Sequence, residues 1–202
     1  MPKDYIPSKF EDFAALFGPG DVPGYLTDGD MAAINDLSKK LPTSGIIVEV
    51  GSFLGKSAVE WAKNLPTYKI ICIDSFNAPL NVLGQLLTEA DFVMPEGPKN
   101  NVELFRHYTK NYPNIKPVTA FFNKKFVFPA TVDLVFEDST HSLEYLSDAL
   151  PFWWDHINTG GILAGHDYND EVAAAVDIFA ALNDLQVNTI NNSSIWYIEK
   201  HA

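Results

Sequence analysis

The sequence predicts an α/β protein with a doubly wound, mainly parallel sheet. Apolar strand-like runs alternate with segments whose apolar residues recur at helical spacing, and this alternation is typical of parallel strands joined by helices. The last two strand-like runs, near 187–191 and 194–199, have no helix between them. They therefore predict an antiparallel hairpin at the edge of the sheet.

The expected elements cover most of the chain. The first helix begins where Thr27 is followed three residues later by Asp30, a helix-capping pattern, and apolar residues continue at helical spacing to Leu41. The later elements are strands at 46–50, 69–74, 116–120, 131–137 and 162–165, and helices at about 55–64, 99–111, 142–157 and 172–182. Gly160 and Gly161 are expected to form the turn before the strand at 162–165.

The chain is expected to form one domain over residues 27–202. Residues 1–26, rich in proline, glycine and phenylalanine, are expected to be a leader that packs on this domain. Residues 75–98 contain several prolines and are longer than a plain connection, so they are a candidate lid.

The overall charge limits the class of partner. A formal net charge of −12 disfavours nonspecific binding to nucleic acid or anionic membranes, which requires basic surface. No apolar run reaches the roughly 18 residues of a membrane-spanning helix, and the N-terminus lacks a signal-peptide core. We therefore expect a cytoplasmic protein with a small-molecule substrate and no nucleic-acid or membrane partner. The sequence leaves open a homo-oligomer.

The segment 46–57, Ile-Ile-Val-Glu-Val-Gly-Ser-Phe-Leu-Gly-Lys-Ser, places a buried strand, an acid, a glycine loop and a helix start within a short distance. Gly51 can adopt backbone angles that a side chain forbids, and Gly55 permits a close approach of a ligand or a helix. Such a loop lies where open α/β sheets bind nucleotide-like ligands, at the carboxyl ends of the strands.

Three loop patterns compete for this segment. A phosphate-binding P-loop requires glycine where this chain has Val50, and the dinucleotide pattern Gly-x-Gly-x-x-Gly fails at Phe53 and Lys56. The pattern acid-x-Gly-x-Gly-x-Gly is met at Glu49, Gly51 and Gly55 and missed at Phe53. We favour this third pattern, which is that of class I S-adenosylmethionine (SAM) methyltransferases.

Polar residues follow three of the other strands. Asp74 ends the strand at 69–74, where a carboxylate can accept hydrogen bonds from a ribose diol; the alternative is a solvated strand-end aspartate. Asp138 is expected to point into the crevice at the strand ends, with His141 close enough to act as a general base. The alternative is a helix-capping aspartate beside an exposed histidine.

His166 and Asp167 follow the strand at 162–165. Titratable side chains are costly to bury without a task, so a site is expected here. With Asp138 they form an oxygen and nitrogen set suited to Mg²⁺, Mn²⁺ or a transition metal. The alternative is that Asp167 caps the next helix and His166 only orients it.

Other prominent residues are expected to be structural. Cys72 and the aromatic group Phe152, Trp153 and Trp154 are expected in the core. Lys56 is expected to be a solvated residue at a helix start. The histidines expected at the surface are His107, His156 and His201.

These motifs together resemble the class I SAM-dependent methyltransferases of the methyltransferase domain 24 type. The resemblance rests on the glycine loop, Ile-Asp-Ser, Asp-Leu-Val-Phe-Glu-Asp-Ser-Thr-His-Ser, Trp-Trp and Gly-Gly-Ile-Leu-Ala-Gly-His-Asp-Tyr, in order over residues 24–199. It implies a seven-stranded, Rossmann-like methyltransferase fold with an antiparallel last strand. The sequence departs from the family pattern at Ser139 and Thr140, where Gly-Asp is usual. It also departs at Ala120-Phe121, where the family often has Gly-Asp or a similar pair, so that adenine contacts there would be apolar or through the backbone.

The resemblance also implies residue roles. The expected cofactor contacts are Glu49, Gly51, Ser52, Phe53, Gly55, Ser57, Asp74, Ser75 and Asp138. The expected catalytic residues are Asp138, His141, His166 and Asp167, and the expected ligands of a divalent metal such as Mg²⁺ are Asp138, His166 and Asp167. The implied activity is SAM-dependent methyl transfer to a small molecule, in the first place to a hydroxyl oxygen. The alternatives are a nonenzymatic SAM-fold binding protein and, less favoured, a nicotinamide-dependent oxidoreductase.

Overall fold

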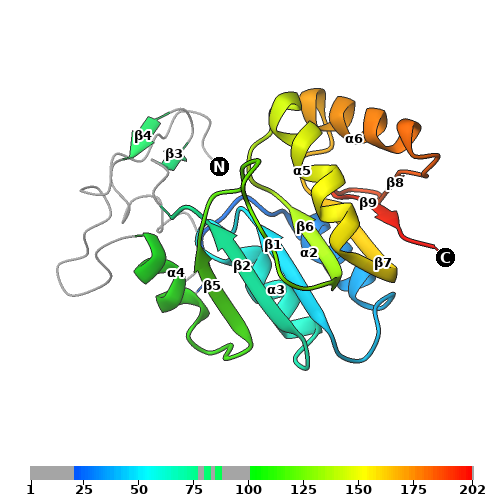
Figure 1. Ribbon diagram of the computed structural model, residues 1–202. Helices are drawn as coiled ribbons and strands as arrows, with labels where there is room; N and C mark the ends of the chain where they lie inside the picture. The colour runs from blue at the N-terminus through cyan, green and yellow to red at the C-terminus, as the bar shows by residue number, and fades with distance from the viewer. Residues whose placement is uncertain (1–20, 77–79, 83–84, 88–100, 202) are drawn as a thin grey trace.

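A seven-stranded sheet forms the centre of the fold, in the strand order β5-β2-β1-β6-β7-β9-β8 (Figure 1). The computed structural model describes residues 21–76, 80–82, 85–87 and 101–201. In sheet order the strands are β5 (Ile115–Thr119), β2 (Lys69–Asp74), β1 (Ile46–Val50), β6 (Val132–Glu137), β7 (Ile157–Gly165), β9 (Trp196–Glu199) and β8 (Asn188–Thr189). Neighbouring strands from β5 to β7 are parallel, and β9 is antiparallel to β7 and β8. The predicted mostly parallel sheet with an antiparallel end is confirmed.

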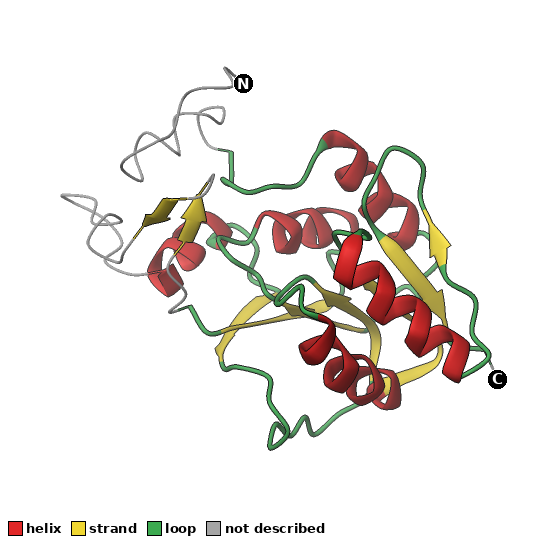
Figure 2. Ribbon diagram, turned by 90° about the horizontal axis from the view of Figure 1, so that it is seen from above, coloured by secondary structure: helices red, strands yellow, loops and turns green. Residues whose placement is uncertain are grey.

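Helices cover both faces of this sheet, as the view from above shows (Figure 2). They are α2 (Asp28–Ser38), α3 (Lys56–Asn64), α4 (Asn101–Thr109), α5 (Leu143–His156) and α6 (Asp170–Leu182). Because successive side chains of a strand point to opposite faces, Ile47 packs in the cluster with α2, α3 and α4, and Val48 packs with α5 and α6. The sheet is therefore doubly wound, as predicted.

The core contains Cys72 and Trp153, as predicted, whereas Phe152 and Trp154 are only partly buried and pack against it. Cys72 and Trp153 are fully buried, each at 0% exposure, on opposite faces of the sheet. Strand β1 lies between β2 and β6, and four of its five residues are buried. An apolar strand of this kind is typical of the centre of a parallel sheet.

The register of the central strands brings several strand ends to one edge. Val50, the last residue of β1, pairs with Ile73 of β2 and Glu137 of β6. Glu137 also pairs with Gly165, the last residue of β7. The polar segments that follow β1, β2, β6 and β7 therefore leave the sheet at neighbouring points.

The structure differs from the sequence prediction at the start of β7. Gly160 and Gly161 do not form a turn, because β7 runs through them from Ile157 to Gly165. The pairing with β6 has a register shift between Val132 and Leu134, and Gly160 has a φ of +83°. Glycine's ability to adopt a positive φ is useful in a bulged strand as well as in a turn. The glycine pair alone therefore did not distinguish a turn from a bulged strand.

The end of α2 and the candidate lid also differ from the prediction. The helix α2 ends at Ser38 rather than near Leu41, and the Ser38 hydroxyl donates to the carbonyl of Ile34. Within the candidate lid at 75–98, Leu80–Val82 (β3) pairs with Gln85–Leu87 (β4) as a separate antiparallel sheet. Most of that segment, and residues 1–20 of the expected leader, lie outside the described residues.

Candidate functional site

Two adjoining cavities lie at the carboxyl ends of the strands and share Gly51, Phe53, Asp138 and Ser139 in their walls. The first, here the Asp74 cavity, has a volume of about 250 Å³. Its other lining residues are Ile73, Asp74, Ser75, Phe76, Asn101, Ala120, Phe121, Phe122, Thr140 and Tyr145. The second, here the His166 cavity, has a volume of about 240 Å³. Its other lining residues are Gly24, Tyr25, Leu26, Ser52, Lys56, Ser57, His141, His166 and Asp167.

The predicted site residues are thus brought to one region, with two exceptions. Glu49 and Gly55 line neither cavity and lie behind the loop that does. Asp74 and Ser75 lie in the first cavity, whereas Ser52, Ser57 and the two histidines lie in the second. Asp138 borders both cavities.

Both glycines of the loop combine a positive φ with close neighbours. Gly51 has a φ of +85°, and a Cβ there would lie 2.2 Å from the carbonyl oxygen of Asp138. Gly55 also has a positive φ, and a Cβ there would meet Thr109 and Phe105 of α4 at 2.7 and 2.9 Å. These contacts leave no room for a side chain at either position.

Phe53 occupies the position where the expected pattern has a glycine. Its φ of 48° is in the left-handed region that glycine adopts most easily. Its backbone N–H donates to Oδ2 of Asp74 at 2.9 Å, which fixes the turn.

Asp74 presents an acceptor group to the first cavity. Its Oδ1 accepts a hydrogen bond from the backbone N–H of Phe76 at 2.8 Å, while Oδ2 accepts from Phe53. Each carboxylate oxygen has a second acceptor site, so the fixed group can still receive hydrogen bonds from a diol. This geometry fits the ribose role better than that of a mobile, solvated aspartate.

Glu49 is a fully buried acid beneath the loop. Burial, with a smaller contribution from the charges of Asp138 and Asp74, raises its pKa to about 8. Ser52 and Ser57 oppose this shift, but neither hydroxyl reaches hydrogen-bond geometry, and among the described residues both carboxyl oxygens lack a partner. A buried polar group of this kind is costly unless a ligand or water satisfies it.

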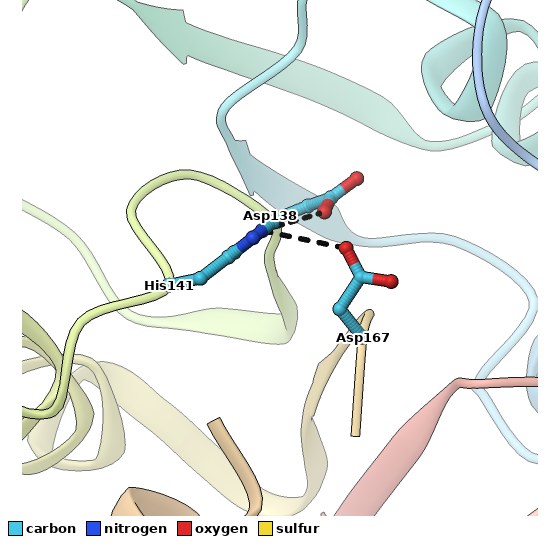
Figure 3. Close-up of side chains that lie close together, drawn as sticks. All are labelled: Asp138, His141 and Asp167. Atoms are coloured by element: carbon cyan, nitrogen blue, oxygen red, sulfur yellow. Dashed lines mark ion pairs between the residues drawn. The ribbon is translucent and has the colours of Figure 1, made fainter. Parts of the chain in front are cut away.

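Three titratable side chains meet in the second cavity, and Figure 3 shows His141 directed at Asp138 and Asp167. Its Nε2 lies 3.8 Å from Oδ1 of Asp138 and 3.5 Å from Oδ2 of Asp167. One ligand atom from each of the three residues lies within 4.8 Å of the others. The neighbouring Asp138 carboxylate raises the pKa of His141, whose side chain is 51% exposed.

His166 lies deeper, and both of its ring nitrogens face carboxylates. Nε2 is 3.3 Å from Oδ2 of Asp30, and Nδ1 is 3.4 Å from Oδ1 of Asp167 and 3.7 Å from Oδ1 of Asp138. Burial alone would lower the pKa of His166, but these carboxylates outweigh it and raise the pKa to about 9. The same histidine lowers the pKa of Asp167, whereas burial raises that of Asp138.

The capping alternatives do not hold. Ser142 caps α5, and its side chain accepts from the backbone N–H of Tyr145 at 3.3 Å. Asn169 is the N-cap of α6. Asp138 and Asp167 therefore keep their carboxylates for the cavity.

Two predictions of exposed residues were wrong. The Lys56 ammonium donates to the carbonyls of Gly24 and Leu26 at 3.2 and 3.0 Å, and burial lowers its pKa. His156 is half-buried, with its ring nitrogens 2.8 and 3.1 Å from the carbonyls of Phe152 and Phe128. His107 and His201 are exposed, as expected. Contacts between distant segments decided these cases, and no local pattern records them.

The sequence did not indicate the network around Glu137. Burial raises the pKa of Glu137 to about 8, and its carboxyl group accepts a short hydrogen bond from the Ser139 hydroxyl. The Ser139 oxygen also lies 2.9 Å from the Tyr145 hydroxyl, on the wall of the Asp74 cavity. The departure at Ser139 thus adds a hydroxyl to this wall. The apolar part of the same wall includes Ala120 and Phe121, where apolar or backbone contacts were expected.

A sequence model of the methyltransferase domain 24 family, described as a methyltransferase domain, matches residues 48–168. The match covers more than half of the chain and includes both histidines of the second cavity. The chain belongs to this methyltransferase domain family. The resemblance that the motifs indicated is therefore confirmed.

Solved methyltransferases share the fold at low sequence identity. The O-methyltransferase NovP is 18% identical, with a TM-score of 0.63 over 86% of this chain and 80% of that chain. An S-adenosylhomocysteine (SAH)-bound methyltransferase of Podospora anserina, PaMTH1, is 15% identical, with a TM-score of 0.59 over 88% and 80%. An rRNA methylase of Streptococcus thermophilus is 12% identical, with a TM-score of 0.60 over 89% and 100%.

Two further results are negative. A search among curated proteins finds no significant match. None of the helices in the described part of the chain is long and apolar enough to cross a membrane.

Proposed function

We propose that this protein is a SAM-dependent methyltransferase that transfers a methyl group to a hydroxyl oxygen of a small molecule. The observation that carries this proposal is the shared wall of the two cavities. One cavity offers the Asp74 acceptor group, the other offers titratable side chains, and Asp138 borders both. A cofactor and an acceptor in these cavities would meet beside Asp138.

The cofactor is assigned to the Asp74 cavity and the glycine loop. The ribose diol would donate to Asp74, and adenine would lie against the apolar wall that includes Ala120, Phe121 and Phe122. The methionine part would follow the loop from Gly51 to Ser57 above Glu49. The family match supports this assignment, and the SAH bound to PaMTH1 agrees with it.

The chemistry requires alignment and removal of one proton. The acceptor oxygen attacks the methyl carbon, the C–S bond breaks with its electron pair on sulfur, and SAH leaves. We assign the hydroxyl proton to the imidazole of His141, which is exposed at the cavity beside Asp138 and Asp167. Because Asp138 raises the pKa of His141, the pH range over which turnover by this route increases should lie above that of an ordinary histidine.

Asp138, His141 and Asp167 also fit a divalent cation. They supply two carboxylates and an imidazole in one cluster, a donor set that Mg²⁺, Mn²⁺ or a transition metal accepts. The set predicted from the sequence contained His166 in place of His141, but both nitrogens of His166 face carboxylates. When bound, such a cation would polarise the acceptor hydroxyl and favour its ionisation. A His141 that binds the cation could not also accept the proton. Turnover that requires a divalent metal would therefore favour the cation route over the route in which His141 is the base.

A small-molecule acceptor is favoured over RNA. The similar structures include a TDP-rhamnose 3'-O-methyltransferase as well as rRNA methylases, so the fold fits both classes. This chain carries a formal net charge of −12, which opposes binding to a polyanion. The small-molecule proposal rests on that charge and on the cavity dimensions.

Calorimetric binding of SAM, SAH and NAD, with and without Mg²⁺, tests the cofactor. We expect SAM and SAH to bind and NAD to fail. Incubation with SAM and a panel of sugars, phenols and amines, followed by measurement of released SAH, then tests the acceptor class. Binding without SAH release from any acceptor would favour the nonenzymatic alternative, and preferential release with amines would contradict O-methylation.

A further inference from the structure

Asp30 is a buried carboxylate that the family match does not include. It lies in the first turn of α2, before the matched residues 48–168, and is 1% exposed. Sequence patterns indicated only its capping role with Thr27, and that capping box is present. The remaining contacts of Asp30 join three distant parts of the chain.

The Asp30 carboxylate is fixed by four donors. Oδ2 accepts from the backbone N–H and the hydroxyl of Thr27 at 2.8 and 2.6 Å. Oδ1 accepts from the Ser193 hydroxyl and the Ser194 backbone N–H at 2.8 and 3.0 Å, in the segment before β9. Each oxygen is therefore held from a different direction, and the group has little freedom to move.

The fixed carboxylate lies beside the His166 ring. Oδ2 of Asp30 lies 3.3 Å from Nε2 of His166, an ion-pair distance without hydrogen-bond geometry, and the backbone N–H of His166 is held by the carbonyl of Glu137 at 3.2 Å. With its backbone anchored at the end of β7, the ring can change position only by side-chain rotation. Nδ1 faces Asp138 and Asp167, 3.7 and 3.4 Å away, so a rotation that moved Nδ1 from them would also separate Nε2 from Asp30.

We propose that Asp30 is a positioning residue of the methyl-transfer site. Acting through His166, it holds Asp138 and Asp167 in the arrangement that accepts a divalent cation with His141. This inference rests on the proposed function, because methyl transfer is what would give the cation cluster a role. It assigns to the region before the glycine loop a part in completing the site.

The competing explanation is that Asp30 only joins α2 to the segment before β9. Ser193→Ala separates the two, because it removes one donor from Oδ1 and leaves the Oδ2 contact with His166 intact. Asp30→Asn retains the size of the side chain but replaces one carboxylate oxygen by a donor. His166→Asn and the Asp30→Asn/His166→Asn double variant complete a double-mutant cycle.

The test measures the affinities of Mn²⁺ alone and of SAH alone by calorimetry on the full chain. We expect Asp30→Asn to weaken Mn²⁺ binding about ten-fold, the lower range for groups that orient metal ligands. SAH affinity should stay within about two-fold of wild type, and Ser193→Ala should retain both affinities. The double variant should bind Mn²⁺ no more weakly than His166→Asn, because Asp30 acts through that ring.

Several results would overturn the inference. The first is an unchanged Mn²⁺ affinity in Asp30→Asn. The second is that Asp30→Asn and Ser193→Ala both lose Mn²⁺ and SAH affinity to the same extent. The third is that the losses of Mn²⁺ affinity from Asp30→Asn and His166→Asn add in the double variant. Absence of Mn²⁺ binding to wild type would also overturn it, while SAH binding would leave the methyl-transfer proposal standing. If wild type binds Mn²⁺ but no SAH, the proposed function fails and the cycle still decides the role of Asp30. If Asp30→Asn does not fold, unchanged Mn²⁺ affinity in His166→Asn would refute the inference.

Discussion

The carboxylate of Asp74 accepts a hydrogen bond from the backbone N–H of Phe53 at 2.9 Å, and thereby joins the end of β2 to the loop after β1. Phe53 has a φ of 48°, a conformation that costs a non-glycine residue energy unless its surroundings hold it. Asp74 supplies that support while it faces the first cavity. One carboxylate thus shapes the loop and presents acceptor oxygens to the cavity.

Asp74→Ala should weaken SAH binding by about ten-fold or more, because each charge-assisted hydrogen bond contributes about 1.5–3 kcal/mol. Asp74→Asn should lie between this variant and wild type, since it keeps one acceptor oxygen. Calorimetry with SAH measures both. Asp148→Ala, which removes an exposed partner of Lys124, is the control and should bind SAH as wild type does. Normal affinity in Asp74→Ala would remove the ribose role.

His141→Ala should lower turnover with an acceptor found in the screen by about 100-fold or more, the contribution usual for a positioned general base. SAH affinity should change little, because the acidic and glycine-loop contacts of the cofactor remain. His107→Ala is the matched control, as that histidine is exposed on α4. Steady-state rates and SAH calorimetry on the three proteins check this. Unchanged turnover in His141→Ala would exclude it both as base and as metal ligand.

The sequence was sufficient to predict the sheet and the edge at which the site lies. Apolar runs ending in Val50, Asp74 and Glu137 marked the strand ends, and parallel neighbours bring such ends together. That rule placed Asp138 and His166 near one another before their distances were known. Their roles in catalysis stay predictions, because proximity does not identify a base or a ligand.

Contacts between segments far apart in the chain could not be predicted. The ion pair of Asp30 with His166 depends on how α2 packs beside the end of β7, and a capping pattern explains Asp30 without it. The same holds for Lys56, whose partners are two backbone carbonyls that carry no side-chain signature. Local patterns specify elements, whereas these contacts arise only when the elements pack.

The stability of the ligand-free protein should fall as the pH rises from about 5 to 8. Burial raises the pKa of Glu49 from 4.5 to about 8, so in this interval the folded state holds a proton that the unfolded state has released. The free energy of unfolding then decreases with pH, by at most about 1.4 kcal/mol per unit for this group. The contribution of Glu49 to stability is fully present below its ordinary pKa of 4.5, where the group is neutral in both states, and it is lost as the pH rises to about 8.

Glu49→Gln isolates this contribution, because the amide is similar in size and does not titrate. The variant should resemble wild type near pH 5 and become the more stable protein near pH 8. His166, with a raised pKa of about 9, also makes stability fall as the pH rises, but it does so in both proteins. Urea unfolding at several pH values measures the difference. Parallel stability curves would show that Glu49 is ionised in the folded protein.

Gly51→Ala should cost more stability than the backbone conformation alone explains. Gly51 and Gly160 have almost the same φ, +85° and +83°, but differ in surroundings. A Cβ at Gly51 would lie 2.2 Å from the Asp138 carbonyl oxygen, whereas nothing lies within 4 Å of a Cβ at Gly160. Gly160→Ala therefore measures the conformational cost by itself, about 1–2 kcal/mol.

The difference between these two variants reports the contact of the glycine loop with the residue after β6. We expect Gly51→Ala to lose at least about 1–3 kcal/mol more than Gly160→Ala, the usual cost of forcing an extra methyl group into packed surroundings. Relief of the clash would move the loop away from Asp138, so SAH affinity should fall in Gly51→Ala and remain normal in Gly160→Ala. Urea unfolding and SAH calorimetry measure the two effects. Equal losses of stability would mean that the loop moves freely from Asp138, and the shared wall of the two cavities would then not be a fixed feature of the site.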